Sequence, residues 1–410
     1  MRRKPLFPPP QDAQGKRKAN KGRQRTTFLT INGRISLQRR WWHSSGEGSD
    51  APADRCLMPD GENVTPGVRE MCCRLNNDGV SFDQVAENLE RTAQVQLSGE
   101  QLRQLVEREG RLVLAAQRTA ELPVSFTAAE CVVAGKPQST RMYVGVDGVM
   151  VPTITDTEKQ QRRTKVVQKR RLAEQAGKRL RPLPPRRNGT DQPYKEFKTI
   201  TFYSEDGKHR HIVLSRARRT KVGVILRRES ARLRFREAGE KIANVDGASW
   251  IPPQLDDADL RLDGRGLDFY HLSENVHAAR RRVYGDEAAE GTAWVETFLH
   301  TLKHEGYERA FESLNTWRNG LRGKKREAAT KLLNYMVERR DMINYPEFLK
   351  KGWQIGSGPT EARCKTSTVR LKRSGQRWDM RHAEEVAALG NLRDSGQWHD
   401  YWASVVRPRT

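Results

Sequence analysis

Three acidic residues occupy positions where the local sequence would bring carboxylates together. Asp147 follows the apolar run Val144-Gly-Val, Asp246 follows Ala243-Asn-Val, and Glu361 follows Gly356-Ser-Gly-Pro-Thr at the start of an expected helix. Carboxylates at the ends of neighbouring strands, with a third on a helix packed across them, provide the oxygen ligands that Mg²⁺ or Mn²⁺ prefers. The set predicts a phosphoryl-transfer site in which two ions, ~4 Å apart, stabilise the attacking and leaving oxygens.

Taken singly, each acid has a simpler interpretation. An Asp-Gly pair such as Asp147-Gly148 is usually a turn, and a glutamate in a first helical turn, like Glu361, is usually a cap favoured by the helix dipole. The ordered set is more specific because basic residues follow Glu361 closely. Those expected to hold DNA phosphates are Lys365, Arg370, Lys372 and Arg373, with Trp378 or Trp250 as an aromatic contact for the scissile strand or a flipped base. Asp256, Asp257, Asp259 and Asp263 are expected to form a solvated acidic loop.

A fourth candidate is the histidine of Asp268-Phe-Tyr-His271, which is expected where a strand leaves the same edge of the sheet. A lone histidine is more often structural than catalytic. In this position, His271 could bond a phosphate or orient an acid, so it joins the candidate catalytic residues. The sequence leaves open whether Asp268 is a metal ligand or a helper.

The elements that must position these residues read as mixed α/β. Short strands are predicted over 142–146, 198–203, 211–214, 242–245 and 266–270, with a long helix over about 216–239. Apolar residues recur at helical spacing over 272–345, which predicts helices there, and an amphipathic helical stretch is expected after Pro359. The core is thus expected over 140–271, with a basic insert at 157–193, a helical insertion over 272–345 and C-terminal helices over 346–410.

The N-terminal part is predicted to be separate from this core. Residues 1–25 are basic and rich in proline, and are expected to be disordered, while Asn32-Gly33 between alternating runs predicts a hairpin with a type I′ turn, followed by a loop, over 26–60. Capping-box patterns at Ser81 and Ser98 predict short helices within 61–122. Such helices suit a helix-turn-helix-like DNA reader, and a generic helical bundle fits the pattern equally.

Charge placement favours nucleic acid as the partner. The 410 residues carry a formal net charge of +24, yet residues 1–45 hold 12 basic residues and one acidic, and residues 157–190 hold 12 basic and two acidic. These two segments are predicted to hold DNA by neutralising phosphates, through Arg39, Arg40, Lys169, Arg170 and Arg171. No run approaches the ~18 apolar residues of a membrane span. The five cysteines have no CxxC spacing, which favours a reduced intracellular protein without disulfides.

Together these motifs resemble a family of bacterial insertion-sequence transposases, the ISKra type, which is related to the Mutator-like group. The resemblance rests on Val144-Gly-Val-Asp147-Gly, Val245-Asp246-Gly-Ala-Ser-Trp250-Ile, Asp268-x-x-His271, Gly356-Ser-Gly-x-x-Glu361 and Arg370-Leu-Lys-Arg-Ser-Gly375-Gln-Arg-Trp378. It covers about 140–402 well and 26–118 loosely. It implies an RNase H-like DDE core in which Asp147, Asp246 and Glu361 bind two Mg²⁺ or Mn²⁺ ions.

The activity implied is cleavage of double-stranded DNA at the element's ends and joining of the freed 3′-OH to target DNA, by a homo-oligomer in the bacterial cytoplasm at the nucleoid. Two features depart from the family: the insert at 157–193 is long, and His43-Ser-Ser-Gly46 with an isolated Cys56 stands where relatives carry paired cysteines, which a zinc site would need. Two alternatives stay open. One is an RNase H-like nuclease that cuts without joining, and the other is a non-catalytic DNA-binding protein derived from a transposase.

Overall fold

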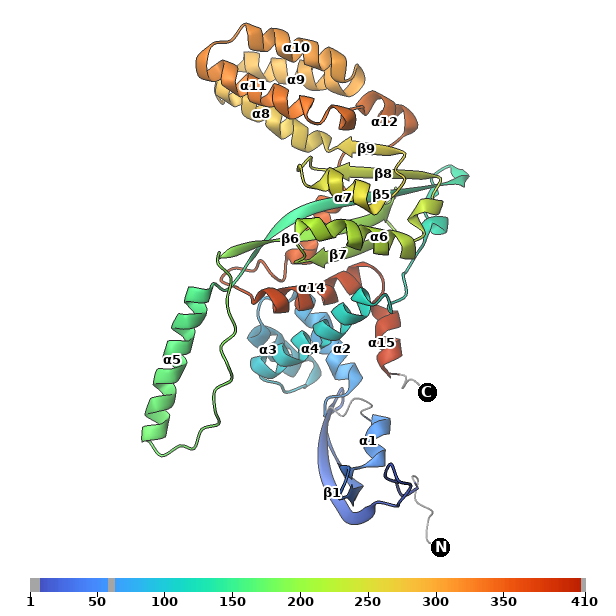
Figure 1. Cartoon of the computed structure of the whole chain (residues 1–410), viewed down its shortest axis with the longest axis vertical. Helices are drawn as coiled ribbons and strands as arrows, with labels where there is room; N and C mark the ends of the chain where they lie inside the picture. Colours follow the sequence, from blue (N-terminus) through green and yellow to red (C-terminus); the bar gives the residue numbers. More distant parts are fainter. Residues whose placement is uncertain (1–7, 58–62, 407–410) are drawn as a thin grey trace. The chain divides into compact units, whose positions relative to one another are not determined.

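The computed structural model describes residues 8–57 and 63–406, which fall into two compact units (Figure 1). The first unit comprises residues 1–122, 381–390 and 397–410, and the second comprises 123–380 and 391–396. Helix α14 (Met380–Asp394) contributes residues to both units, and α15 (Trp398–Val406) belongs to the first.

The first unit begins with a β-hairpin, as Asn32-Gly33 predicts. Strand β1 (Ala19–Thr30) pairs antiparallel with β2 (Gly33–Ser44), followed by β3 (Gly48–Asp50) and α1 (Pro52–Leu57). The expected type I′ turn is wrong, because only Gly33 takes a positive φ, of +90°, and Asn32 does not. The expected disorder over 1–25 is also wrong for 19–25, since pairing with the long β2 extends β1 back to Ala19. Residues 1–7 lie outside the described residues.

Three helices follow, and the two start signals predicted from the sequence, at Ser81 and Ser98, are confirmed. They are α2 (Pro66–Asp78), α3 (Phe82–Ala93) and α4 (Gly99–Arg118). Ser81 caps α3 by accepting a hydrogen bond from the Gln84 backbone N–H, and Ser98 forms a complete capping box with Gln101. The helix-turn-helix-like function of this region stays a prediction.

The second unit is built on a mixed sheet, so the predicted mixed α/β class is confirmed. The strand order is β7-β6-β5-β8-β9, in which β5, β6 and β7 are antiparallel neighbours while β8 and β9 run parallel to β5. The strands are β5 (Lys136–Pro152), β6 (Tyr194–Ser204), β7 (Arg210–Ser215), β8 (Glu240–Val245) and β9 (Gly264–Leu267), with the short β4 (Val132–Val133) paired to β5. The central strands are almost wholly buried, which explains their continuous apolar runs.

Strand β5 is much longer than the sequence predicts. It does not end at Asp147, because it pairs with β6 as far as Pro152 opposite Tyr194. Pairing with β8, in contrast, ends at Val144, so Asp147 lies on a part of β5 with β6 on one side only. Gly148 lies inside the strand, where a Cβ would lie 2.3 Å from Glu196 Oε1, the end of a flexible side chain that packs over the glycine. An Asp-Gly pair therefore marks close packing here and not a turn.

One set of helices packs against this sheet, and a second set forms the helical region that the sequence predicts between Asp268 and Glu361. The helix expected over 216–239 is shorter, α6 (Val222–Arg232), with 3₁₀ turns on either side, and α7 (Ile251–Ala258) takes up part of the expected acidic loop. The insertion consists of α8 (Phe269–Tyr284), α9 (Ala289–His304), α10 (Tyr307–Asn319), α11 (Gly323–Val337) and α12 (Tyr345–Lys351). Helix α13 (Gly358–Thr368) then returns to the sheet, where it packs on β5 and β6.

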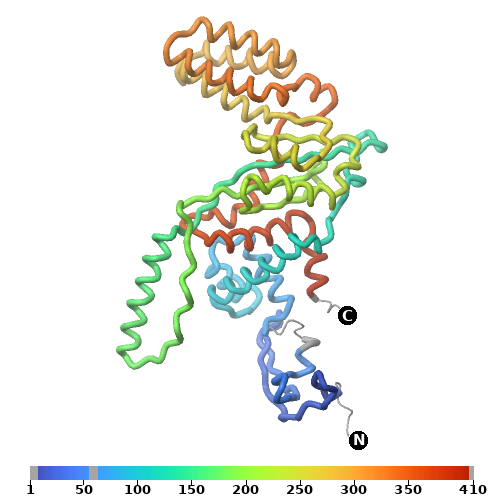
Figure 2. Tube along the Cα trace, viewed as in Figure 1, coloured from blue at the N-terminus to red at the C-terminus, as the bar shows by residue number. Residues whose placement is uncertain are grey.

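The basic insert forms a long helix followed by an extended return segment. Helix α5 (Asp156–Gln175) has no buried residue along its 20 positions. Residues 176–193 return beside it, held in part by a hydrogen bond of 2.8 Å from Arg163 Nη1 to the Pro184 carbonyl (Figure 2). A helix that buries nothing gains little from tertiary packing, so its side chains remain available to a partner.

Two predictions about the class of protein can be checked directly. The cysteines whose side chains are described (Cys72, Cys73, Cys131 and Cys364) are free thiols, as expected, while the side chain of Cys56 lies outside the described residues. No helix among the described residues is long and apolar enough to cross a membrane.

A buried ionic network fixes α6 to the sheet. The Glu229 carboxylate is 1% exposed and accepts hydrogen bonds from His211 Nε2 at 3.0 Å on β7 and from Arg232 Nη1 at 2.6 Å. Burial alone would raise the pKa of Glu229, but the His211 hydrogen bond and the charges of His211, Arg228 and Arg232 outweigh it and lower the pKa to about 2. The ionised carboxylate therefore stabilises the folded second unit.

We expect Glu229→Gln to destabilise the protein by roughly 3 kcal/mol at pH 7, measured as a lower urea midpoint. Because the folded pKa lies below the ordinary 4.5, this stabilisation is complete above about pH 4.5 and is lost as the pH falls toward 2. The difference from wild type should therefore shrink at pH 3. Glu237→Gln, which breaks an exposed pair with Arg234, is the control and should leave the urea midpoint close to that of wild type, because solvent screens an exposed ion pair. A difference independent of pH would contradict the ionic origin.

Candidate active site

Two aspartates lie on neighbouring parallel strands. Strands β5 and β8 pair in constant register from Arg141 with Glu240 to Val144 with Ala243. The same offset separates Asp147 from Asp246, so the two residues occupy corresponding positions three residues beyond the last paired residues of the two strands. The charge of Asp246 acts on Asp147 and raises its pKa, which places the two carboxylates within electrostatic reach.

The environment of Asp147 makes its negative charge costly. Burial is the largest cause of its raised pKa, and the Asp246 charge adds to it. Two hydrogen bonds act in the opposite direction, from the Cys364 thiol to Oδ2 at 3.1 Å and from the Gly148 backbone N–H to Oδ1 at 2.6 Å. A cation beside this carboxylate pair would relieve the remaining repulsion.

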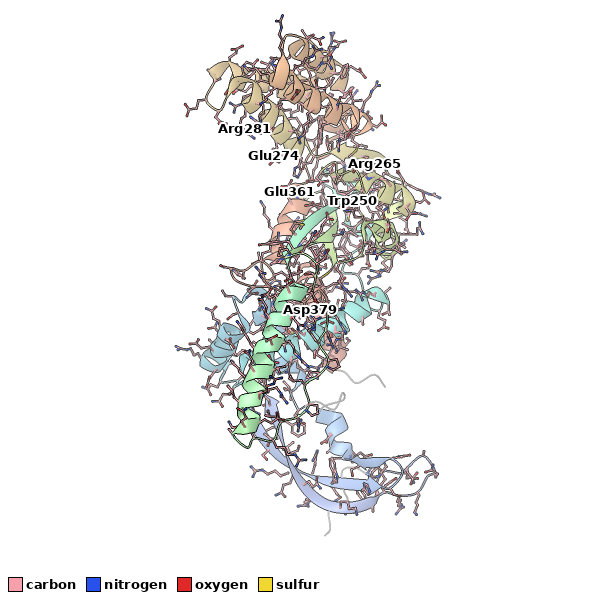
Figure 3. The ribbon with its side chains drawn as sticks, turned by 60° about the vertical axis from the view of Figure 1, so that its left-hand side comes forward. Trp250, Arg265, Glu274, Arg281, Glu361 and Asp379 are labelled. Carbon is pink, nitrogen blue, oxygen red and sulfur yellow. The ribbon has the colours of Figure 1, made fainter. Side chains whose placement is uncertain are left out.

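Glu361 and His271 form a second pair, from α13 and α8. His271 Nε2 lies 3.4 Å from Glu361 Oε1, and the side chains are 34% and 36% exposed. Ser357 Oγ donates to the same glutamate oxygen at 3.2 Å. The charge of His271 also acts on Asp147, lowering its pKa, so both pairs face the same region. Figure 3 shows Glu361 on α13 together with Glu274 and Arg281 of α8, the helix that carries His271.

Asp268 is a positioning residue in this structure. Its side chain is fully buried and caps α8, with Oδ1 accepting from the His271 backbone N–H at 2.8 Å. Oδ2 accepts from the backbone N–H of Ser357, the residue before α13. The Asp268 backbone N–H in turn donates to the Val245 carbonyl at 2.8 Å, next to Asp246. Both carboxylate oxygens are thus engaged, and His271, which the sequence placed at a strand end, stands in the first turn of a helix.

Helix α13 approaches the sheet closely because of a glycine on β5. A Cβ at Gly145 would lie 1.8 Å from Thr360 Oγ1 and 2.8 Å from Thr360 Cβ. The close approach also places the side chain of Cys364, a residue of α13 that is 7% exposed, against Asp147. Cys364 was not among the residues predicted for the site, although its position three residues after Glu361 places it near Glu361 on the same helix.

The donor set partly fits the expected metal ions. Among the described residues, no group of three or more His, Cys, Asp or Glu side chains lies close enough to hold an ion. Asp147 and Asp246 nevertheless provide hard oxygen donors, and the charge of Asp246 raises the pKa of Asp147. Mg²⁺ commonly takes one or two protein carboxylates and keeps several waters, so this pair is compatible with such an ion.

The residues of the second unit that are predicted to contact DNA fall into an exposed group and a buried group. Lys365, Lys372, Lys169 and Arg171 are exposed, and Arg170 bonds the Arg181 carbonyl beside α5. Arg370 and Trp378 are buried, at 4% and 6% exposure, with the guanidinium 5.1 Å from the ring centroid. Burial and the neighbouring Arg373 lower the pKa of Arg370 to about 10. These two residues pack inside the unit and present no free face to DNA, which corrects the surface position expected for them.

The predicted contact residues of the hairpin and of the start of α7 also differ in their exposure. Arg40 is exposed, whereas Arg39 is largely buried, pairs with Asp54 and lies 4.7 Å over the Trp41 ring. Trp250 is half-buried at the start of α7, with the Arg219 guanidinium 5.8 Å from its ring (Figure 3).

Comparison with known proteins adds little to this geometry. No family model matches the chain, and no curated protein matches its sequence. Among solved structures the chain is similar to the Drosophila P element transposase strand transfer complex, with 10% sequence identity and a TM-score of 0.28, over 85% of this chain and 83% of that chain. At this level the similarity carries no argument about function.

We expect Gly145→Ala to displace α13, because rotation of Thr360 could move its Oγ1 but not its Cβ out of contact. The expected readout is faster alkylation of Cys364 in the folded protein, by roughly tenfold or more, measured by peptide mass spectrometry. Gly358→Ala, at the start of the same helix, meets nothing within 4 Å and serves as the control. Equal Cys364 alkylation in wild type and Gly145→Ala would show that the close approach does not position α13.

Proposed function

We propose that the chain is a DDE transposase with an RNase H-like core, which cleaves DNA at the ends of an insertion sequence and joins the 3′-OH to target DNA. The observation that supports the proposal is that Asp147 and Asp246 follow the same register on adjacent parallel strands, and that Asp246 and His271, the partner of Glu361, both act electrostatically on the Asp147 carboxyl. The chain would act as a homo-oligomer on paired ends in the bacterial cytoplasm.

The side chains at this edge have distinct roles in the proposal. Asp147, Asp246 and Glu361 would hold two Mg²⁺ or Mn²⁺ ions, which when bound supply charge stabilisation to the attacking and leaving oxygens. Cys364 and the Gly148 N–H hold the Asp147 carboxylate in one orientation. His271 and Ser357 hold Glu361 near the sheet edge from two directions. Asp268 fixes the backbone on which His271 and Ser357 stand.

We expect Asp147→Asn, Asp246→Asn and Glu361→Gln each to lower DNA cleavage by at least about 10³-fold, since each removes one charge that would bind metal. The assay supplies duplexes bearing the element's ends, with Mg²⁺ or Mn²⁺, and resolves nicked and joined products. His271→Ala should be less severe, about 10- to 100-fold, because His271 acts through Glu361.

The control is Asp256→Asn, the same change at an exposed α7 residue paired with Arg265. It should leave the cleavage rate within about twofold of wild type. Cleavage that survives in all three acid variants would overturn the proposed site. Products that are cut but never joined would favour the nuclease, and specific binding to the ends without cleavage by wild type would favour the non-catalytic DNA-binding protein.

We expect Lys169→Glu with Arg171→Glu to weaken DNA binding about tenfold or more and to lower the slope of log affinity against log salt concentration by about two. Helix α5 buries no residue, so the variant should fold normally. Fluorescence anisotropy across a salt series measures both effects. Lys208→Glu, at an 81% exposed lysine in the turn between β6 and β7, is the matched control. An unchanged slope in the α5 variant would show that α5 does not contact phosphates.

A further inference from the structure

We propose that a groove along α11 binds the stretch of duplex DNA that flanks the cleaved phosphodiester on one of its two sides. This inference rests on the proposed function and assigns a second part of the substrate to the helical insertion. The groove has a volume of about 750 Å³ and lies outside every DNA contact that the sequence predicts. Its lining residues are Gly323, Arg326, Glu327, Thr330, Lys331, Asn334, Tyr335, Glu338 and Arg339.

The groove ends at the loop that carries Asp246. Tyr335 donates its hydroxyl hydrogen to the Asp246 carbonyl at 3.3 Å, and Arg339 Nε donates to the Gly247 carbonyl at 2.8 Å. The Arg339 guanidinium also lies 4.0 Å from the centroid of the Tyr335 ring. A Cβ at Gly247, where φ is +81°, would lie 2.8 Å from Arg339 Nε, so the loop and α11 are in close contact. A DNA strand bound in the groove would therefore reach the proposed active site at Asp246 while staying in contact with the protein surface.

The charges along the groove favour an anionic partner. Arg326 and Lys331 are exposed, and the run from Arg322 to Arg326 at the start of α11 contains four exposed basic residues. The lining contains two glutamates. The negative charge of one, Glu338, is balanced by Arg339, whose Nη1 lies 2.9 Å from Glu338 Oε2. The polar lining and the basic end at Arg322 fit phosphates better than an apolar ligand or an acidic metal site.

The length and openness of the groove favour a polymer. Helix α11 has 15 residues, which at 1.5 Å per residue gives about 22 Å. That length corresponds to about six base pairs at 3.4 Å each. Tyr335 is the only aromatic residue in the lining, and Arg339 covers one face of its ring, so the lining offers more contacts to phosphates than to stacked bases. Recognition in this groove is thus by phosphate contact and is independent of base sequence.

The test is a charge reversal, Arg326→Glu with Lys331→Glu, which leaves Tyr335 and Arg339 in place. Binding is measured by fluorescence anisotropy in a salt series with EDTA present, so that no cleavage occurs. Three duplexes are compared: one extending ten base pairs to both sides of the cleavage position, and two that each lack one flank. We expect the variant to bind the full duplex about tenfold more weakly, with a salt slope lower by about two. The loss should persist on one truncated duplex and disappear on the other.

Arg309→Glu with Lys350→Glu is the matched control, since these residues of α10 and α12 do not line the groove. Wild-type affinity in the groove variant, or an equal loss on all three duplexes, would overturn the inference. Circular dichroism checks that the variant is folded. Failure of the proposed function is a separate result, in which wild type cleaves no DNA in Mg²⁺ or Mn²⁺, because the binding measurement needs no catalysis.

Discussion

The buried carboxylate of Asp268 is the interaction on which the candidate site depends. Its oxygens accept the backbone N–H groups of His271 and Ser357, and its own N–H donates to Val245. The end of β8, the first turn of α8 and the start of α13 therefore meet at one side chain. A buried carboxylate without such donors is costly, so the three segments must come together for the second unit to fold. Geometry at the candidate site and stability of the fold are thus set by the same hydrogen bonds.

The opposite end of the sheet holds the chain as it returns from the helical insertion. Arg141, 2% exposed on β5, forms ion pairs with Glu240 and Glu205 and donates to the Gly352 carbonyl at 2.8 Å. Asn244 on β8 donates to the Gln354 carbonyl at 2.9 Å. The segment between α12 and α13 is therefore anchored along its length by residues 110 and 211 positions earlier in the chain, and Asp268 and His271 then hold its end near Glu361.

The basic residues divide into two groups with different physical roles. On α5 and at the start of α11 they face solvent, where phosphate contacts cost no internal packing. Arg370 and Arg39 instead stack on Trp378 and Trp41, and Arg339 stacks on Tyr335, so that their guanidinium groups stabilise the fold through rings and carbonyls. A count of basic residues near a motif consequently overstates the positive charge that is exposed at the surface.

The sequence by itself determined the elements whose signals are local: the hairpin around Asn32-Gly33, the capped helices after Ser81 and Ser98, the helical insertion and the strands that precede Asp147 and Asp246. Apolar period and capping residues act within a few positions, so they can be read without the fold. Only the tertiary structure decided that β5 continues through Asp147, that Asp268 is a support, that Cys364 meets Asp147 and that Arg370 is buried. Each of these depends on a neighbour far away in the chain, and an Asp-Gly pair or an arginine carries no local mark of which neighbour it will have.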